Sequence, residues 1–371
     1  MKYYIIAGEA SGDLHASNLM KALKQTDPEA DFRYWGGDLM KEQGGTLVKH
    51  YRELAFMGFV EVLFNITTIL KNISFCKADI MDYEPDVIIF VDYPGFNLRI
   101  ANWAKQKGFR THYYISPQIW AWKENRISDI KRDIDQMYVI LPFEKNFYEK
   151  KHKFPVHFVG HPLIDAIADR ELVDAENFKL EHNLDDRPII ALLPGSRKQE
   201  ITKMLKVMLS ITEDFPDYQF VIAGAPSQEV EFYQHFIRKK NIRLVMNKTY
   251  DVLSLSNAAL VTSGTATLET ALFKVPEVVC YKGSLISYQI AKRVINLDFI
   301  SLVNLIMGRE VVKELIQNSF NKKQLKAELK NILLEDRRKK MFEDYYLLEQ
   351  KLGGKGASKK TAELIYQAIN K

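Results

Sequence analysis

Short runs of β-branched and aromatic residues alternate along the chain with longer segments that have the apolar periodicity of amphipathic helices. In the first half, these runs predict strands at 3–7, 87–92, 111–115 and 137–141. The pattern starts again in the second half, with strands predicted at 189–193, 219–223, 258–262 and 277–281. Strands that alternate with helices form parallel sheets covered on both faces. The pattern therefore predicts an α/β protein with two Rossmann-like units.

A charged stretch at 170–187 separates the two units. It predicts a first domain at 1–170, a second domain at 171–345 and C-terminal crossover helices at 346–371. The lysine- and glycine-rich segment 351–360 is predicted to be a hinge before a last helix at 361–370. We expect that helix to return to the first domain.

Composition excludes several classes of protein. Hydrophobic residues make up 47% and charged residues 27% of the chain, as in a packed globular protein. The net charge of +5 is too small for a nucleic-acid-binding protein, but it favours an anionic membrane surface or a phosphorylated substrate. Cys76 and Cys280 lie far apart in sequence, which excludes a disulfide framework or a cysteine-rich zinc site and indicates a reducing cytoplasm.

No segment predicts a signal peptide or a spanning helix. The N-terminus lacks the positively charged region and the long apolar region of a signal peptide. The most apolar stretch, 54–70, is interrupted by Glu61 and Asn65, whereas a spanning helix needs about 20 apolar residues. The sequence therefore predicts a protein that touches a membrane without crossing it.

Open α/β sheets bind ligands outside the carboxyl ends of their strands, so the residues that follow each strand are candidates for a site. After strand 3–7, the turn GEASGD offers Gly8, Glu9, Ser11, Gly12 and Asp13. Glycine permits close backbone approach, and the free N–H groups of a helix start attract an oxygen-rich ligand. The same residues would also form an ordinary turn capped by Ser11 or Asp13. The sequence leaves both interpretations open.

Asp92 ends the apolar strand at 87–92, which places a carboxylate at the carboxyl edge of the sheet. A sugar transferase that joins a hydroxyl to an anomeric carbon needs a base. Partial burial would raise the pKa of an aspartate above its usual value of about 3.9, which would make it a better base. Asp92 is our candidate base. The alternative is a turn or helix-capping aspartate.

Further strand ends in the first unit carry aromatic and polar residues. We expect the two Rossmann-like units to face each other across a cleft, and the segment SPQIWAW at 116–122 is predicted to form a wall of that cleft, with Ser116 and Gln118 available for polar contacts. His161, in a Gly-His-Pro turn, lies near the predicted domain junction. A lone histidine there is more often a supporting group than a catalyst.

Two turns in the second unit suit phosphate. Strand 189–193 leads into PGSRK, where Ser196 and Arg197 open a helix and the guanidinium can bind two oxygens. Strand 258–262 leads into Ser263, Gly264, Thr265 and Ala266, followed by Glu269, which could accept both hydroxyls of a ribose. The alternatives are an exposed capping arginine and a capping-box glutamate.

A metal site is not expected. The sequence has one Asp-x-Asp pair, Asp133 and Asp135, but it precedes a strand instead of following one. We expect Arg197 and the helix starts to stabilise a departing diphosphate without a metal or other cofactor.

Taken together, these motifs resemble those of the lipid-A-disaccharide synthase family over essentially the whole chain. The matching segments, in chain order, are GEASGD at 8–13, MGFVEV at 57–62, SPQIWAW at 116–122, LPFE at 141–144, GHP at 160–162, LPGSR at 193–197, SGTATLE at 263–269, SLVNL from 301 and GREVVKELIQ to 317. Several long motifs in one order are far more specific than a single glycine turn.

The resemblance implies a GT-B fold and an inverting, metal-independent hexosyltransferase. The donor would be UDP-2,3-diacylglucosamine and the acceptor the 6-hydroxyl of 2,3-diacylglucosamine 1-phosphate (lipid X), giving the β-1,6-linked lipid A disaccharide 1-phosphate and UDP in lipopolysaccharide synthesis. By motif match, Asp92 would be the base, Arg197 a phosphate ligand and Asn304 a further active-site residue. Residues 263–269 would bind the nucleotide. The family works at the inner face of the cytoplasmic membrane, and a homodimer with exchanged tails stays open beside a monomer.

The segment 57–73 is the predicted site for acyl chains or the anionic membrane surface. On a helix, one apolar stripe comprises Phe59, Val62, Leu63, Ile66, Leu70 and Ile73, and a shorter one comprises Met57, Val60 and Phe64. Glu61, Asn65, Thr68 and Asn72 form the polar face. We expect one stripe to dock on the core and the shorter one to contact lipid; burial of both by a neighbouring loop is the alternative.

Glu277, beside Pro276, departs from the expected pattern because it puts a charge where a neutral residue is expected.

Two other functions remain as alternatives. A UDP-N-acetylglucosamine 2-epimerase would share the fold but not need the apolar segment 54–70. A non-catalytic sugar-nucleotide-binding membrane adaptor would not need Asp92.

Overall fold

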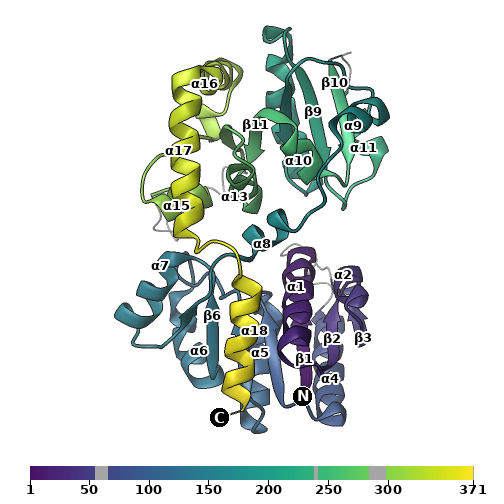
Figure 1. The fold of residues 1–371 in the computed structure, drawn as a ribbon, viewed down its shortest axis with the longest axis vertical. Helices are drawn as coiled ribbons and strands as arrows, with labels where there is room; N and C mark the ends of the chain where they lie inside the picture. Colours follow the sequence, from purple (N-terminus) through teal and green to yellow (C-terminus); the bar gives the residue numbers. More distant parts are fainter. Residues whose placement is uncertain (55–65, 238–240, 284–297, 371) are drawn as a thin grey trace. The chain divides into compact units, whose positions relative to one another are not determined.

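The computed structural model describes residues 1–54, 66–237, 241–283 and 298–370. The chain divides into two compact units (Figure 1), Met1–Ala168 with Leu352–Lys371 and Asp169–Lys351. The sequence predicts breaks after 170 and 345. The second break lies later in the structure because one helix, α17 (Glu335–Lys351), continues unbroken through that position.

Within the described ranges, the first unit contains a seven-stranded parallel sheet of order β3-β2-β1-β4-β5-β6-β7. Its strands are β1 (Lys2–Ala7), β2 (Asp31–Gly36), β3 (Thr46–His50), β4 (Val87–Val91), β5 (Thr111–Tyr114), β6 (Gln136–Val139) and β7 (His157–Phe158). The central strands β1 and β4 are buried on both faces, so they appear in the sequence as continuous apolar runs.

Helices cover both faces of this sheet. The helices are α1 (Ala10–Thr26), α2 (Asp38–Glu42), α4 (Ile66–Tyr83), α5 (Pro94–Gln106), α6 (Ile127–Asp133), α7 (Pro142–Lys145), α8 (Pro162–Ala168) and α18 (Ala357–Ile369), with shorter helical turns at Tyr51–Glu53, Glu124–Arg126 and Asn146–Lys151. Side chains of α4, α5 and α6 pack with Tyr4, Ile6 and Phe90 in one core. On the other face, α18 packs against α1 and α8, so the last helix returns to the first unit, as predicted.

The second unit repeats this design. In the part of the chain that the structure describes, it has a six-stranded parallel sheet of order β10-β9-β8-β11-β12-β13. The strands are β8 (Ile189–Leu193), β9 (Gln219–Gly224), β10 (Ile242–Met246), β11 (Ser256–Thr262), β12 (Glu277–Tyr281) and β13 (Lys313–Ile316). Its helices are α9 (Ala175–Glu181), α10 (Lys198–Met208), α11 (Val230–Gln234), α12 (Thr249–Ser254), α13 (Thr265–Leu272), α15 (Leu302–Met307), α16 (Lys322–Leu333) and α17, with 3-10 turns at Leu209–Asp214 and Gln317–Ser319. The two-unit α/β prediction is confirmed.

Several predicted boundaries differ from the structure for local reasons. The last helix begins at Ala357, inside the predicted hinge, because the carboxylate of Asp165 accepts hydrogen bonds from the backbone N–H groups of Gly356 and Ser358 at 2.7 and 3.0 Å. The charged stretch 170–187 contains the short helix α9, whose N-terminus is capped by Asp174. Both helices start where a carboxylate satisfies backbone donors.

Candidate active site

The end of β4 has an unusual backbone. Asp92 and Tyr93 both lie in the left-handed region, with φ values of 45° and 49°, and Pro94 then begins α5. A non-glycine residue rarely adopts this conformation, and strained residues of this kind gather at functional sites. β4 therefore ends at Val91, and Asp92 belongs to the turn instead of the predicted strand.

The turn after β4 lies against the turn after β1. A Cβ atom at Gly8 would come within 2.3 Å of the ring of Tyr93, so only glycine fits beneath that ring. Burial raises the pKa of the Asp92 carboxyl to about 6, and the negative charge of Glu9 contributes further. The structure thus brings Gly8, Glu9 and Asp92 together, and it gives Asp92 a basicity suited to accepting a proton near neutral pH.

Other candidates from the first turn have structural roles. Ser11 is exposed, whereas Gly12 is buried, and a Cβ atom added at Gly12 would lie 3.3 Å from the Cβ of Ala7. The buried carboxylate of Asp13 accepts hydrogen bonds from the backbone N–H groups of Gly37 at 2.7 Å and Met40 at 3.1 Å. This carboxylate anchors the start of α2, and a contact of Asp13 with a ligand stays a prediction.

Ser116 is likewise engaged within the protein. Its hydroxyl donates to the buried carboxylate of Glu144 at 2.6 Å, and the indole N–H of Trp120 donates to the same oxygen at 3.1 Å. Backbone N–H groups of Ile140 and Leu141 complete the contacts of Glu144, whose pKa burial raises to about 7. The hydroxyl of Ser116 therefore holds the carboxylate of Glu144, and a contact of Ser116 with substrate stays a prediction.

Gln118 is exposed next to this network and remains accessible. His161 is buried, and its Nδ1 accepts a hydrogen bond from the backbone N–H of Leu163 at 3.2 Å. Its own backbone N–H donates to the carbonyl of Leu352 at 2.9 Å. Burial, with a smaller effect of His15, lowers the pKa of His161 to about 3. His161 is thus a neutral group that supports the returning tail, as its alternative interpretation predicts.

In the second unit, the two phosphate-suited turns meet in one pocket of about 240 Å³ at the carboxyl ends of β8 and β11. Its lining includes the predicted Ser196, Ser263, Gly264, Thr265, Ala266 and Glu269. Gly195 lies in the left-handed region with φ 99°, which residues with a side chain rarely adopt, so this turn favours glycine. Two glycine turns facing one cavity present backbone groups to an oxygen-rich ligand.

Arg197 is the exposed residue that precedes α10. No described residue pairs with its guanidinium, so the charge is available to an anion. Glu269 accepts a hydrogen bond from the hydroxyl of Tyr250 at 2.9 Å, and burial raises the pKa of its carboxyl. This contact fixes one oxygen of Glu269 at the pocket wall.

Sequence patterns missed the residues that extend this pocket. Thr249, Ala225 and Pro226 line it, and Pro226 and Thr249 also line a neighbouring pocket of about 250 Å³ with Asn247 to Asp251. They follow β9 and β10. β10 is a half-exposed edge strand interrupted by Arg243, so it gives no continuous apolar run in the sequence.

Asn304 is fully buried on α15, and both ends of its side-chain amide are used. Its Oδ1 accepts from the backbone N–H groups of Val311 and Val312 at 2.7 and 3.0 Å. Its Nδ2 donates to the carbonyl of Val312 at 2.8 Å and to Glu314 at 2.9 Å. Asn304 therefore organises the loop around it and offers no free group to a substrate in this structure.

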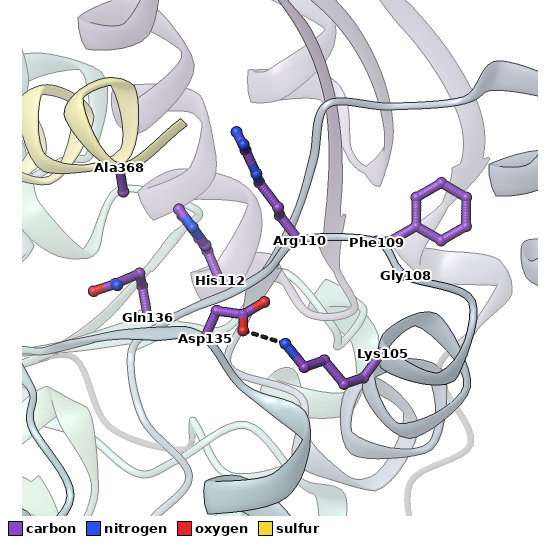
Figure 2. A pocket seen from close by; sticks show the side chains of 8 residues that line it. All are labelled: Lys105, Gly108, Phe109, Arg110, His112, Asp135, Gln136 and Ala368. Atoms are coloured by element: carbon purple, nitrogen blue, oxygen red, sulfur yellow. Dashed lines mark hydrogen bonds and ion pairs between the residues drawn. The ribbon is translucent and has the colours of Figure 1, made fainter. Parts of the chain in front are cut away.

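The Asp-x-Asp pair lies at the opposite edge of the first sheet. Figure 2 shows Asp135 beside a pocket of about 270 Å³ at the amino ends of β5 and β6, paired with Lys105. Asp133 accepts from Arg132 and Asn102. Both carboxylates are occupied by donors of the protein itself. Across the described residues, no group of three or more His, Cys, Asp or Glu is arranged to hold a metal ion.

The predicted lipid-contacting residues Met57, Phe59, Val60, Leu63 and Phe64 lie outside the described residues. The segment continues into α4, where Ile73 of the longer stripe is buried in the core, as predicted, but two other positions differ from the prediction. Leu70 is 54% exposed, whereas Asn72 is buried and its Oδ1 accepts from Lys49 at 3.0 Å. The side chain of Asn72 is thus turned toward the protein, because Lys49 of β3 donates a hydrogen bond to it.

Comparison with known proteins gives a consistent result. Residues 3–369 match the family described as lipid-A-disaccharide synthetase. The chain is 40% identical over 375 residues to lipid-A-disaccharide synthase of Syntrophus aciditrophicus (strain SB), covering 99% of this chain and 97% of the relative. It is 39% identical over 318 residues to lipid-A-disaccharide synthase of Coxiella burnetii (strain Dugway 5J108-111), covering 84% of each.

Solved structures with the same fold are more distant in sequence. UDP-GlcNAc 2-epimerase from Neisseria meningitidis, bound to UDP-GlcNAc, has a TM-score of 0.68 and 12% identity, with 100% of both chains covered. MurG of Acinetobacter baumannii has a TM-score of 0.59 and 13% identity, with 99% of both chains covered. Identities this low establish the shared GT-B architecture alone.

Proposed function

The chain belongs to the lipid-A-disaccharide synthase family and is a UDP-sugar-dependent hexosyltransferase of lipid A synthesis, and from this premise we propose how its residues perform the transfer. The donor is UDP-2,3-diacylglucosamine and the acceptor is the 6-hydroxyl of lipid X. The family match over residues 3–369 supports these substrates, and the partly buried carboxyl of Asp92 at the carboxyl edge of the first sheet, whose pKa burial raises to about 6, supports the transfer step.

Asp92 acts as the general base. Its carboxylate takes the proton of the acceptor hydroxyl while that oxygen attacks the anomeric carbon of the donor, and UDP leaves from the opposite face with inversion. At pH 7 a group with a pKa near 6 is mostly ionised, yet it is a stronger base than an ordinary aspartate. Burial contributes most to the raised pKa of Asp92, and the negative charge of Glu9 raises it further.

The second unit binds the nucleotide. The diphosphate occupies the pocket between the turns at Gly195 and Gly264, where the start of α13 presents backbone N–H groups. Arg197 supplies a charge-assisted contact to the leaving diphosphate. Glu269 accepts the ribose hydroxyls, and the neighbouring pocket at Thr249 receives the base. In this mechanism, cationic side chains and helix starts stabilise the leaving group without a metal.

The protein works on the inner face of the cytoplasmic membrane. Exposed Leu70, Phe75 and Met81 on α4 continue the apolar segment 57–64 and support contact with lipid. The net charge of +5 supports attraction to an anionic leaflet. In the described part of the chain, no helix has the length and apolarity needed to span a bilayer.

The experiment that tests this mechanism measures UDP release by the purified protein with donor alone and with donor plus lipid X. Release that requires lipid X, together with formation of the disaccharide, supports the proposal. An epimerase would consume the donor without lipid X, and a non-catalytic adaptor would bind it without releasing UDP. Asp92→Asn should keep UDP binding but lose about 10²–10⁴-fold in transfer. Near-normal turnover of this variant would remove Asp92 from the mechanism.

A further inference from the structure

The conformation of Asp92 needs an explanation, because two consecutive non-glycine residues in the left-handed region are strained. The β4–β5 ladder ends at Val91, and the backbone N–H of Asp92 makes the last contact, with the carbonyl of Tyr114 at 3.1 Å. Beyond this point the chain turns, which places the ring of Tyr93 over Gly8 and the carboxylate of Asp92 near Glu9. Strain of this kind persists only where surrounding contacts fix it.

Two buried side chains supply those contacts by donating to one atom. The hydroxyl of Tyr113 donates to the backbone carbonyl of Asp92 at 2.5 Å, and the Nδ2 of Asn97 donates to the same oxygen at 2.7 Å. Asn97 also donates to the carbonyls of Ile6 and Val91, each at 3.3 Å. Both side chains are completely buried, so water does not compete for these donors.

The two side chains that donate to the Asp92 carbonyl come from different secondary-structure elements. Tyr113 comes from the neighbouring strand β5, and Asn97 from the first turn of α5, one turn after Asp92. The Asp92 carbonyl is thereby held between a strand and a helix at the point where the ladder ends. The ring of Tyr113 also packs on Phe90, with ring centroids 5.9 Å apart, which fixes the direction of its hydroxyl.

We propose that Tyr113 and Asn97 are positioning residues for the reaction, which hold the carbonyl of Asp92 so that its carboxylate faces the acceptor hydroxyl. This inference rests on the proposed role of Asp92 as the base. Neither residue touches the substrate. Removing one donor lets the turn relax toward an ordinary conformation, which moves the carboxylate and exposes it to water.

Tyr113→Phe is the informative variant because it removes one hydroxyl and keeps the ring. We expect kcat to fall by about 10- to 100-fold, since misplacing a catalytic group by about 1 Å can cost 10²-fold, with little change in the KM of the donor. The acidic limb of the pH profile of kcat/KM should also shift to a lower pH than in the wild type, because a better-solvated Asp92 has a lower pKa. A purely structural role would not move this limb.

Tyr138→Phe is the matched control. Tyr138 lies on the adjacent strand β6, is completely buried, and has its hydroxyl 3.3 Å from the Nδ1 of His112, away from Asp92. The Tyr138→Phe variant loses a buried hydrogen bond in the same sheet, but one that does not involve Asp92. It should therefore retain the wild-type pH profile and nearly the wild-type kcat. Asn97→Ala removes the other donor and serves as an independent variant if Tyr113→Phe does not fold.

A double-mutant cycle with Asp92→Asn completes the test. If Tyr113 acts through Asp92, adding Tyr113→Phe to Asp92→Asn causes less than about a 3-fold further loss. Equal losses in both backgrounds, or a Tyr113→Phe profile matching that of Tyr138→Phe, would overturn the inference while leaving Asp92 as the base. Near-normal activity of Asp92→Asn alone would instead overturn the proposed function, and this inference with it.

Discussion

Replacing Glu277 by methionine should stabilise the protein, and the gain should grow as the pH rises. Glu277 begins β12 and is completely buried, and neither of its carboxylate oxygens has a hydrogen-bond partner among the described residues. Burial raises the pKa of this carboxyl well above its usual value, and the charge of Glu314 raises it further. Methionine has a side chain of similar length and buries no polar group.

The magnitude follows from two contributions. A buried polar group without a partner costs about 1–3 kcal/mol, which methionine removes at every pH. The second contribution is linkage: the folded protein keeps the proton of Glu277, whereas the unfolded chain releases it above a pKa of about 4.3. The wild-type protein therefore loses about 1.4 kcal/mol per pH unit from this group between roughly pH 5 and its raised folded pKa.

Thermal unfolding of the full chain at pH 5.5 and pH 7.5 measures both contributions. For a unit of this size, about 1 kcal/mol corresponds to roughly 2–4 °C in Tm, so the advantage of Glu277→Met should be measurably larger at pH 7.5 than at pH 5.5. Glu277→Gln is the control, because it removes the titration but keeps a buried polar group. Its Tm advantage over the wild type should also grow with pH, but at each pH it should be smaller than that of Glu277→Met. A methionine variant that is less stable than the wild type at both pH values would refute the reasoning.

Three further predictions concern the donor and the membrane. Arg197→Ala should raise the KM of the donor by about 10- to 150-fold, the equivalent of a charge-assisted contact of roughly 1.5–3 kcal/mol, as steady-state kinetics would show; an unchanged KM would remove Arg197 from the donor site. EDTA should leave the wild-type rate unchanged, whereas loss of activity that magnesium restores would require a metal site. Leu70→Ser, together with Val60→Ser and Phe64→Ser, should reduce liposome binding and transfer from fully acylated donor more than transfer from a short-chain analogue, with Tm nearly intact. Equal losses on both donors would show that these residues are ordinary core.

Much of the second unit's pocket follows from local sequence. The turns after 189–193 and 258–262 both carry a glycine and small hydroxyl residues, and the carboxyl ends of parallel strands lie at one edge of a sheet. Gly195 and Gly264 were therefore expected on one side of the unit, and they line the same pocket. Thr249 was missed because the strand before it is at the edge of the sheet.

The sequence by itself determined the two α/β units, the turns that follow their central strands, and the placement of Asp92 at the end of β4, because these depend on periodicity and on glycine and proline at fixed positions. Only the tertiary structure decided which polar groups remain available. Ser116 donates to Glu144, and Tyr113 donates to the carbonyl of Asp92, each across at least 21 residues of chain. Such pairs depend on strand register and on which helix covers which face, so no local pattern reveals them.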